Sequence, residues 1–329
     1  MDQRGPRATA SQVSLLPDGG SGRIDVLRTE PAAGVDAFLE SWIASLSLPS
    51  DLHEAITYAV LGGGKRLRPI LCWHCAIAAH AAHRGARDAA AGHRAVPAGA
   101  AIELIHAFSL VHDDLPAMDD DATRRGRPTL HVHAGEAMAI LAGDAMLAMA
   151  FDAISAEPPR GEPYNAALRS ALLHELTAGS VGMIVGQVHD TFRRFPQELT
   201  DLERVERTHR CKTGALLRTS CRSGALVGTD GDVEAPVVAS LSDYAECIGL
   251  MFQIVDDLMD VEQPAEAIGK ATNKDAEAGK LTYPSVLGVE GSRRRVDELA
   301  TQAATALEPL GGAGDDLRLL CDFLARRSA

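Results

Sequence analysis

Two clusters of aspartates are the residues of this sequence best suited to chemistry. The first runs from Asp113 to Asp121, and the second is Asp256-Asp-Leu-Met-Asp260. Two like charges about 4 Å apart repel by about 4 kcal/mol at an effective dielectric near 20. A hard divalent cation with oxygen ligands removes this repulsion, and magnesium is the usual choice beside phosphates. The clusters therefore predict magnesium ions that hold a diphosphate substrate.

The helix expected before the first cluster carries a polar line on an otherwise apolar surface. Glu103, His106, Ser109 and Asp113 are spaced three, three and four residues apart, which places them on one helical face. The helix that ends in the second cluster repeats the pattern at positions 246, 249, 253, 256, 257 and 260. A solvated helix end is the alternative for either cluster alone. Two such stripes on apolar helices favour a buried acidic site.

Basic residues are also placed where a diphosphate could use them. In Gly62-Gly-Gly-Lys-Arg-Leu-Arg-Pro69, Lys65 and Arg68 lie near the start of an expected helix, whose amides and dipole favour anions. A solvated basic loop is the alternative. Further basic residues lie near the acidic clusters or on helices between them: Arg124, Arg125, Lys212 and Lys270. No lysine completes a P-loop and no GxGxxG follows a strand, which argues against nucleotide binding by those routes.

The composition limits the partners. The formal net charge of −13 argues against nucleic acid or an anionic membrane as the main partner. No run of about 18 apolar residues is present, so no membrane insertion is expected. The six cysteines, without a secretory signal, fit free thiols in the cytoplasm. Cys72 and Cys75 have CxxC spacing, but without a second pair we favour buried packing over zinc or redox chemistry.

The sequence predicts one helix after another, with no alternating strand pattern and no βαβ repeat. Residues 1–30 lack periodicity and are expected to be a disordered leader, with a targeting peptide as the alternative. The expected helices cover residues 34–48, 51–63, 66–84, 97–115, 130–157, 164–185, 202–227, 237–260, 282–309 and 313–326. The prediction is an all-α helical bundle, with residues 31–329 in a single catalytic domain.

Together these motifs resemble those of the trans-isoprenyl diphosphate synthases, the polyprenyl synthetase family. The resemblance covers about residues 34–326 and rests on motifs in the family's order: the Gly63–Pro69 box, Asp113–Asp121 with Arg124-Arg-Gly126, Lys212-Thr-Gly214, Phe252-Gln253, Asp256–Asp260 and Gly279–Pro284. It implies an isoprenoid synthase-type bundle with a central cavity and a homodimer. It also implies condensation of an allylic diphosphate with isopentenyl diphosphate.

The resemblance assigns roles to individual residues. Three aspartates would bind three magnesium ions: Asp113, Asp119 and Asp256. Supporting polar residues would be Asp114, Asp257, Asp260, Gln187 and Asp190. The allylic diphosphate would be held by Arg124, Lys212 and Lys270, and isopentenyl diphosphate by Lys65, Arg68, His106 and Arg125. The reacting carbons would face Thr213 and Gln253.

The residues before the first cluster bear on product length. Phe108 lies five residues and Ser109 four residues before Asp113, and five helical residues span about 7.5 Å. An aromatic residue there, with a two-residue insertion in the first motif, resembles the pattern of farnesyl (C15) diphosphate synthases. A ring at this depth would block a growing chain. Geranylgeranyl (C20) and geranyl (C10) diphosphate remain alternative products.

Other classes of protein explain fewer of these residues. A terpene cyclase would not need the second basic set that includes Lys65 and Arg68. A non-catalytic subunit of a prenyl synthase would be expected to have a broken aspartate motif, and both motifs are complete. A helical interaction module leaves the polar stripes unexplained.

Overall fold

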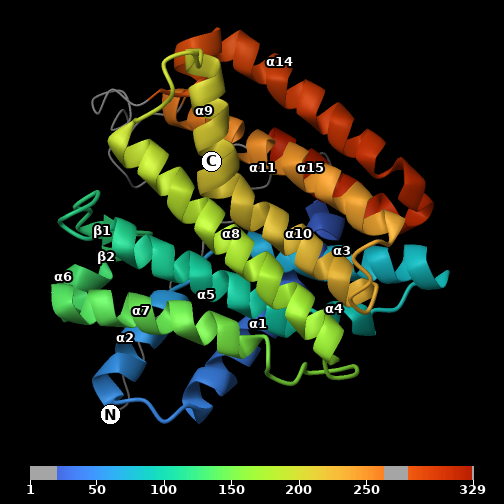
Figure 1. Cartoon of the computed structure of the whole chain (residues 1–329), viewed down its shortest axis with the longest axis horizontal. Helices are drawn as coiled ribbons and strands as arrows, with labels where there is room; N and C mark the ends of the chain where they lie inside the picture. Colours follow the sequence, from blue (N-terminus) through green and yellow to red (C-terminus); the bar gives the residue numbers. More distant parts are fainter. Residues whose placement is uncertain (1–20, 263–280, 328–329) are drawn as a thin grey trace, which may run out of the picture.

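Fifteen helical segments and one short hairpin make up the described part of the chain, residues 21–262 and 281–327 of a computed structural model (Figure 1). The helical segments are α1 (Ser21–Ser45), α2 (Ser50–Val60), α3 (Leu67–Arg84), α4 (Ala90–Arg94), α5 (Val96–Asp113), α6 (Leu130–Ala134), α7 (Glu136–Ala153), α8 (Ala166–Phe192), α9 (Asp201–His209), η1 (Arg210–Gly214), α10 (Ala215–Gly228), α11 (Pro236–Glu262), α14 (Tyr283–Ala306), η2 (Glu308–Gly314) and α15 (Asp315–Arg326). The hairpin pairs β1 (Thr123–Arg124) with β2 (Arg127–Pro128). The all-α prediction is confirmed.

The centre of the bundle is the contact between α3 and α10. A Cβ atom on Gly224 of α10 would lie 2.2 Å from the Cys72 carbonyl oxygen, and one on Gly228 would lie 2.5 Å from the Ala76 carbonyl oxygen. Only glycine allows two helix backbones to come this close. The cysteines of α3 are fully buried in this contact, as predicted for a packing role.

Two apolar cores lie on either side of this central pair. One is built mainly on α1, α2, α5, α7 and α8, and the other on α10, α11, α14 and α15. α5 and α11 each carry an aspartate cluster at or near their C-terminal ends, so burying their apolar faces fixes the position of each cluster. Asp114 and Asp257 are buried, whereas Asp119 and Asp260 are exposed. By length and composition alone α11 could cross a membrane, but 56% of the relevant window is buried inside the fold, as in the core helix of a globular protein.

Three expectations about secondary structure are wrong. Residues 21–30 are not disordered, because α1 begins at Ser21 and its Ile24 and Leu27 are buried in the core; residues 1–20 of the predicted leader lie outside the described residues. The segment expected as one helix from 130 to 157 is broken at Gly135, whose φ of +88° is outside the helical range. The segment expected as one helix from 202 to 227 contains the π-helical turn η1. The short helix α4 was not predicted.

A hairpin also interrupts the helices, where no strand was expected. Its two turn residues, Arg125 and Gly126, have φ values of +54° and +71°. This combination is typical of a tight two-residue turn between antiparallel strands, with glycine at the second position. The turn directs Arg124 back toward the end of α5.

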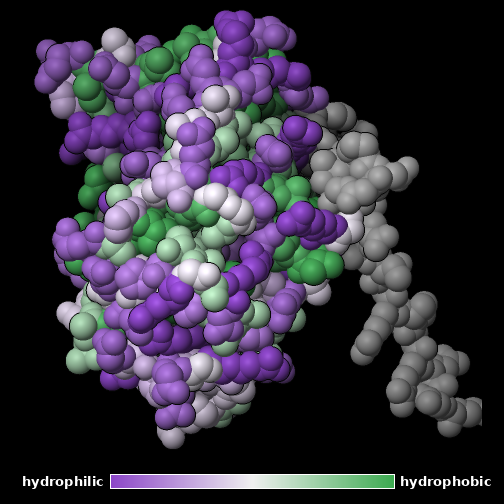
Figure 2. Space-filling model, turned by 90° about the vertical axis from the view of Figure 1, so that its right-hand side faces the viewer, coloured by the Kyte–Doolittle hydropathy of each residue, from purple (hydrophilic) through white to green (hydrophobic). Residues whose placement is uncertain are grey.

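An apolar stripe remains exposed on α7 and α8, which run across the front of the molecule in Figure 1, and α5 packs against both. On α8 the spacing of three, four and seven residues gives one helical face. We define the α7–α8 stripe as Ile140, Leu141, Val181, Ile184, Val185 and Val188, which are 41–57% exposed. The side of the molecule shown in Figure 2 differs, because it is mostly hydrophilic with small scattered hydrophobic patches.

Candidate active site

The first aspartate cluster is held at the end of α5 by a closed loop and an ion pair. The Asp119 backbone N–H donates to the Asp113 carbonyl at 2.9 Å, which keeps Asp119 beside the helix end. The buried Asp114 carboxylate accepts from Arg124, with Nε 2.9 Å from both oxygens and Nη2 2.6 Å from Oδ1. Such a bidentate pair fixes geometry as well as neutralising charge. Arg124, predicted to bind diphosphate, therefore also anchors the acidic loop.

Asp113 differs from its neighbour, because its charge is only partly compensated. Burial raises the pKa of Asp113 to about 6; Lys212 lowers this pKa and Asp119 raises it. Oxygen donors with an unfavourable negative charge suit a hard cation. Among the described residues, however, no three His, Cys, Asp or Glu side chains converge tightly enough to form a ready metal cage. The residues therefore fit magnesium only if other ligands complete its coordination.

A basic pocket lies where α3, α5 and the hairpin meet. Burial lowers the pKa of Arg68, and its Nε has no hydrogen-bond partner. The pKa of His106 is well below its usual value because of burial, and because Arg68 and Arg125 lie nearby. Burial also lowers the pKa of Arg125. Three of the residues predicted to bind isopentenyl diphosphate are thus together, and the two guanidinium groups of Arg68 and Arg125 concentrate positive charge that an anion would stabilise.

Lys65 connects this pocket to the second aspartate cluster. Lys65 lies in the loop before α3. Partial burial and the nearby Arg327 lower its pKa, whereas Asp256 raises it. Asp256 also raises the pKa of Arg68. The second acidic cluster and the basic box, distant in sequence, therefore act on one another electrostatically.

Glu103, expected on the polar stripe of α5, has a structural role. It forms a buried ion pair with Arg66, whose Nη1 lies 2.9 Å from Glu103 Oε1. Arg66 also pairs with Asp36 at 2.7 Å and donates to the Val60 carbonyl at 2.7 Å. Its left-handed φ of +49° turns the chain into α3. This network fixes the start of α3, and with it Lys65 and Arg68, against α5.

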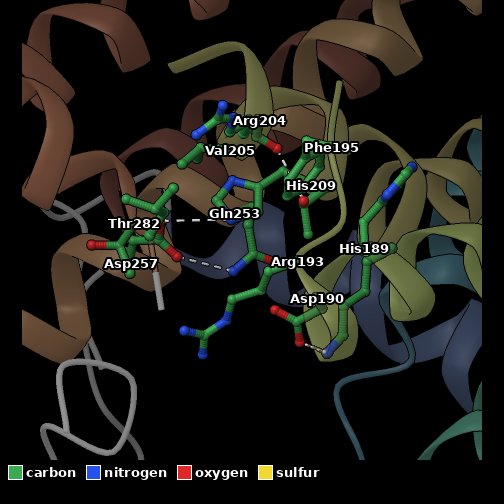
Figure 3. Close-up of a pocket in the computed structure, with 13 residues that line it drawn as sticks. His189, Asp190, Arg193, Phe195, Arg204, Val205, His209, Gln253, Asp257 and Thr282 are labelled. Carbon is green, nitrogen blue, oxygen red and sulfur yellow. Dashed lines mark hydrogen bonds and ion pairs between the residues drawn. The ribbon is translucent and has the colours of Figure 1, made fainter. Parts of the chain in front are cut away.

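The other end of the site holds two groups of hydrogen bonds on η1, α8 and α11, and Figure 3 shows Asp190, Gln253 and Asp257, which take part in them. Lys212 Nζ donates to Asp190 Oδ2 at 2.6 Å, and Thr213 Oγ1 donates to Gln253 Oε1 at 2.8 Å. Gln253 Nε2 in turn donates to Asp257 Oδ1 at 3.1 Å. The two predicted reacting-carbon residues are therefore paired, and their orientation is set by Asp257.

Asp257 also receives the Tyr283 backbone N–H at 3.0 Å, which ties α11 to the start of α14. His209 stacks on the Tyr283 ring, and burial lowers its pKa to about 4, so it is neutral at pH 7. A cavity of about 230 Å³ opens between these elements, and four of the predicted residues line it: Asp190, Lys212, Gln253 and Asp257. Neither acidic Asp113 nor Asp256 lines this cavity.

The structure adds one residue that sequence reasoning missed, Arg327. Its guanidinium lies 3.6 Å from the centre of the Phe252 ring, donates to the Phe252 carbonyl at 2.8 Å, and pairs with Asp256. Burial raises the pKa of Asp256, and Arg327 lowers it. No local motif surrounds Arg327, so only the folding of α15 against α11 brings it to the site.

The remaining predicted residues have varied positions. Gln187 is half-buried on α8, and its Nε2 has no hydrogen-bond partner; Asp260 is exposed near the end of α11. Phe108 is buried and packs edge-to-face on His112, with ring centres 4.9 Å apart. Ser109 donates to the His106 carbonyl at 2.9 Å. Lys270 lies outside the described residues.

The chain is similar to known proteins both in sequence and in fold. The family described as Polyprenyl synthetase matches residues 49–309. Geranylgeranyl pyrophosphate synthase 7 of Arabidopsis thaliana is 40% identical over 302 residues, which cover 90% of this chain and 82% of the relative. The solved structure of an FPP/GFPP synthase from Zymomonas mobilis is 33% identical with a TM-score of 0.75, covering 93% of this chain and 99% of its own. That of geranylgeranyl pyrophosphate synthetase from Pyrococcus horikoshii Ot3 is 27% identical with a TM-score of 0.73, covering 94% and 99%. The chain therefore belongs to the polyprenyl synthetase family and is a trans-prenyltransferase.

Proposed function

We propose that the enzyme joins an allylic diphosphate, dimethylallyl or geranyl, head-to-tail to isopentenyl diphosphate. The observation that carries this proposal is that diphosphate-binding side chains lie in two separate places. Lys212 lies close enough to Asp113 to lower its pKa, whereas Arg68, His106 and Arg125 form the basic pocket at the start of α3. Two diphosphates need two such sets, and a cyclase that ionises one diphosphate needs only one.

Magnesium is the cofactor of this proposal, with three ions held by Asp113, Asp119 and Asp256 and by the allylic diphosphate. Magnesium usually takes only one or two carboxylates and completes its octahedron with water and substrate phosphates. Among the described residues no three His, Cys, Asp or Glu side chains form a metal site by themselves, which is compatible with magnesium coordination completed by water and substrate. When bound, the ions neutralise the diphosphate and make it a better leaving group.

The residues of the chain bind the two substrates, align them and exclude water from the reacting carbons. In the proposed reaction the allylic C–O bond breaks, and the isopentenyl double bond forms the new C–C bond. A proton of the isopentenyl unit then passes to the departing diphosphate. Lys212, with Arg124 and Lys270, holds that diphosphate, and Lys65 joins the basic pocket around isopentenyl diphosphate. The paired Thr213 hydroxyl and Gln253 amide offer fixed dipoles to the developing cation, since Asp257 prevents them from turning away.

We propose farnesyl diphosphate as the product. Phe108 is buried on α5 five residues before Asp113, where its ring is held by His112 and would block a longer chain. The second candidate is geranylgeranyl diphosphate, and it is favoured by the names of relatives such as the Arabidopsis thaliana and Capsicum annuum synthases, which are 40% and 39% identical.

We further propose that the enzyme is a cytoplasmic homodimer that does not insert into membranes. The six cysteines are free, which fits a reducing compartment. The residues of the α7–α8 stripe are exposed and apolar on two long helices, and exposed apolar residues grouped in this way mark interaction sites. A twofold axis would pair the stripe with its own copy, as in most homodimers.

The first test is incubation with dimethylallyl diphosphate, isopentenyl diphosphate and magnesium, followed by chromatography of the dephosphorylated products. We expect a C15 alcohol, and we expect EDTA to abolish its formation. Asp113→Ala and Asp256→Ala should each lower kcat about 10³-fold, since losing a metal ligand removes several kcal/mol of charge stabilisation. Circular dichroism should show an intact fold. A cyclic hydrocarbon, or product insensitive to EDTA, contradicts the proposal.

Magnesium binding should weaken as the pH falls. The pKa of Asp113, about 6, is above its usual 3.8, so the ionised carboxyl destabilises the apo protein above about pH 6 and a bound cation removes that cost. Below pH 6 a proton competes with the metal, and the magnesium concentration for half-maximal thermal stabilisation should rise up to about tenfold per pH unit. In Asp113→Asn this dependence should be flatter. Equal slopes in the two proteins would show that Asp113 is not the ligand.

Phe108→Ala should lengthen the main product from C15 to C20, because it removes the ring proposed to block the chain. Ser109→Ala is the matched control one residue away, and it should leave the C15 product unchanged. The measurement is the distribution of chain lengths from the same assay. An unchanged distribution of chain lengths in Phe108→Ala would mean that a residue other than Phe108 limits the length of the product.

Ile184→Asp should raise the dissociation constant of the dimer at least about 100-fold, because it buries an unpaired charge in the stripe. Sedimentation velocity at several protein concentrations gives that constant. Val26→Asp is the control, since Val26 is also exposed and apolar but lies on α1, outside the stripe. An unchanged dissociation constant of the dimer in Ile184→Asp would mean that the interface lies elsewhere.

A further inference from the structure

The residues proposed to hold and face the allylic substrate, Lys212 and Thr213, lie in an unusual piece of backbone. The turn η1 (Arg210–Gly214) is π-helical, inserted between α9 and α10. Single π turns are rare, cost stability relative to α-helix, and occur frequently at functional sites. Something outside the turn must therefore hold it in place.

On one side the turn meets α8 at Gly186 without any intervening side chain. A Cβ atom at Gly186 would lie 2.1 Å from the Lys212 backbone nitrogen, 2.4 Å from Lys212 Cα and 2.6 Å from the Cys211 carbonyl carbon. Carbon atoms attract at about 3.5–4.0 Å and repel well inside that separation. Since the three atoms are backbone, no side-chain rotation can relieve the clash. The approach of η1 to α8 therefore requires glycine.

On the other side the turn meets α11 at Gly249. A Cβ atom there would lie 3.0 Å from Gly214 Cα, again a backbone atom. The π turn is thus clamped between two helices whose backbones approach it at glycines.

Each glycine precedes, by one helical turn on its own helix, the residue that binds a side chain of η1. Asp190 is four residues after Gly186 and accepts from Lys212 at 2.6 Å. Gln253 is four residues after Gly249 and accepts from Thr213 at 2.8 Å. Residues four apart lie on the same helix face. The depth at which η1 sits against each glycine therefore sets the distance to each hydrogen-bond partner.

We propose that Gly186 and Gly249 are positioning residues for the reaction: their missing side chains set the depth of the π turn so that Asp190 orients Lys212 and Gln253 orients Thr213 toward the allylic diphosphate. The inference rests on the function proposed above. Gly186 is the stricter of the two positions, because its clash is the closer one. Neither glycine touches substrate in this proposal.

The chain offers a matched control on the same face of α8. Gly182 lies one turn before Gly186, but a Cβ atom there would lie 3.1 Å from the Ala215 Cβ, a side-chain atom beyond the π turn. Alanine favours helix more than glycine at both positions. A purely structural effect of adding a methyl group to this face would therefore appear in both variants.

Gly186→Ala should raise the KM for the allylic diphosphate at least tenfold and lower kcat about 100-fold, since a shift near 1 Å can cost that much. The KM for isopentenyl diphosphate should stay within twofold, because the basic pocket on α3 is not displaced. Gly182→Ala should keep all three values within twofold. Equal losses in both variants, or an unchanged allylic KM in Gly186→Ala, would overturn the inference.

Crystal structures of the variants supply a readout that does not depend on catalysis. In Gly186→Ala the π turn should move away from α8 and the 2.6 Å bond between Lys212 and Asp190 should break; in Gly182→Ala it should remain. If the wild-type protein forms no prenyl product, the proposed function is wrong. The crystal structures still test whether Gly186 and Gly249 position the π turn. If Gly186→Ala does not fold, Gly249→Ala replaces it, with loss of the 2.8 Å bond between Thr213 and Gln253 as the expected result. An undisturbed turn would contradict the inference.

Discussion

Charge buried among helices is the constraint on which the rest of this structure depends. A buried carboxylate or guanidinium without a partner destabilises a fold by several kcal/mol, so each must be paired, hydrogen-bonded or reserved for a ligand. Both solutions are present. In each aspartate cluster one carboxylate has a resident arginine, Asp114 with Arg124 and Asp256 with Arg327. Arg66 and Glu103 neutralise each other at the start of α3.

Some of the charges assigned to ligands remain poorly compensated, whereas Asp256 and Lys212 already have partners within the protein. Asp113 keeps a raised pKa, and Arg68 keeps a buried Nε without a partner. Burial, together with the arginines around it, lowers the pKa of His106 well below its usual value. Metal and diphosphate would supply the missing opposite charges, which gives binding energy a direct electrostatic source.

Close backbone packing is the second means by which the fold supports the site. Glycines bring α10 onto α3 and bring η1 against α8 and α11, where larger residues would separate the elements. The same packing buries the apolar faces of α5 and α11 and leaves their polar faces turned inward. The rigid helices can then hold dipoles such as the Thr213–Gln253 pair in one orientation.

The sequence by itself determined the helical class, the two aspartate clusters and the set of basic residues around them, because helical periodicity and motif spacing are local properties. It also placed Glu103, His106 and Asp113 on one face of α5. It could not predict the ion pairs of Glu103 with Arg66 and of Asp256 with Arg327, because these partners come together only when distant helices pack. The π turn was read as ordinary helix, since nothing in Lys212-Thr213 locally signals it. The hairpin at Arg125–Gly126 and the first ten residues of α1 were missed for a related reason: both are stabilised by tertiary contacts, such as the burial of Ile24, rather than by a pattern of their own. Which acids are neutralised and which remain available for a ligand was decided only by the tertiary structure, because compensation depends on distance through space.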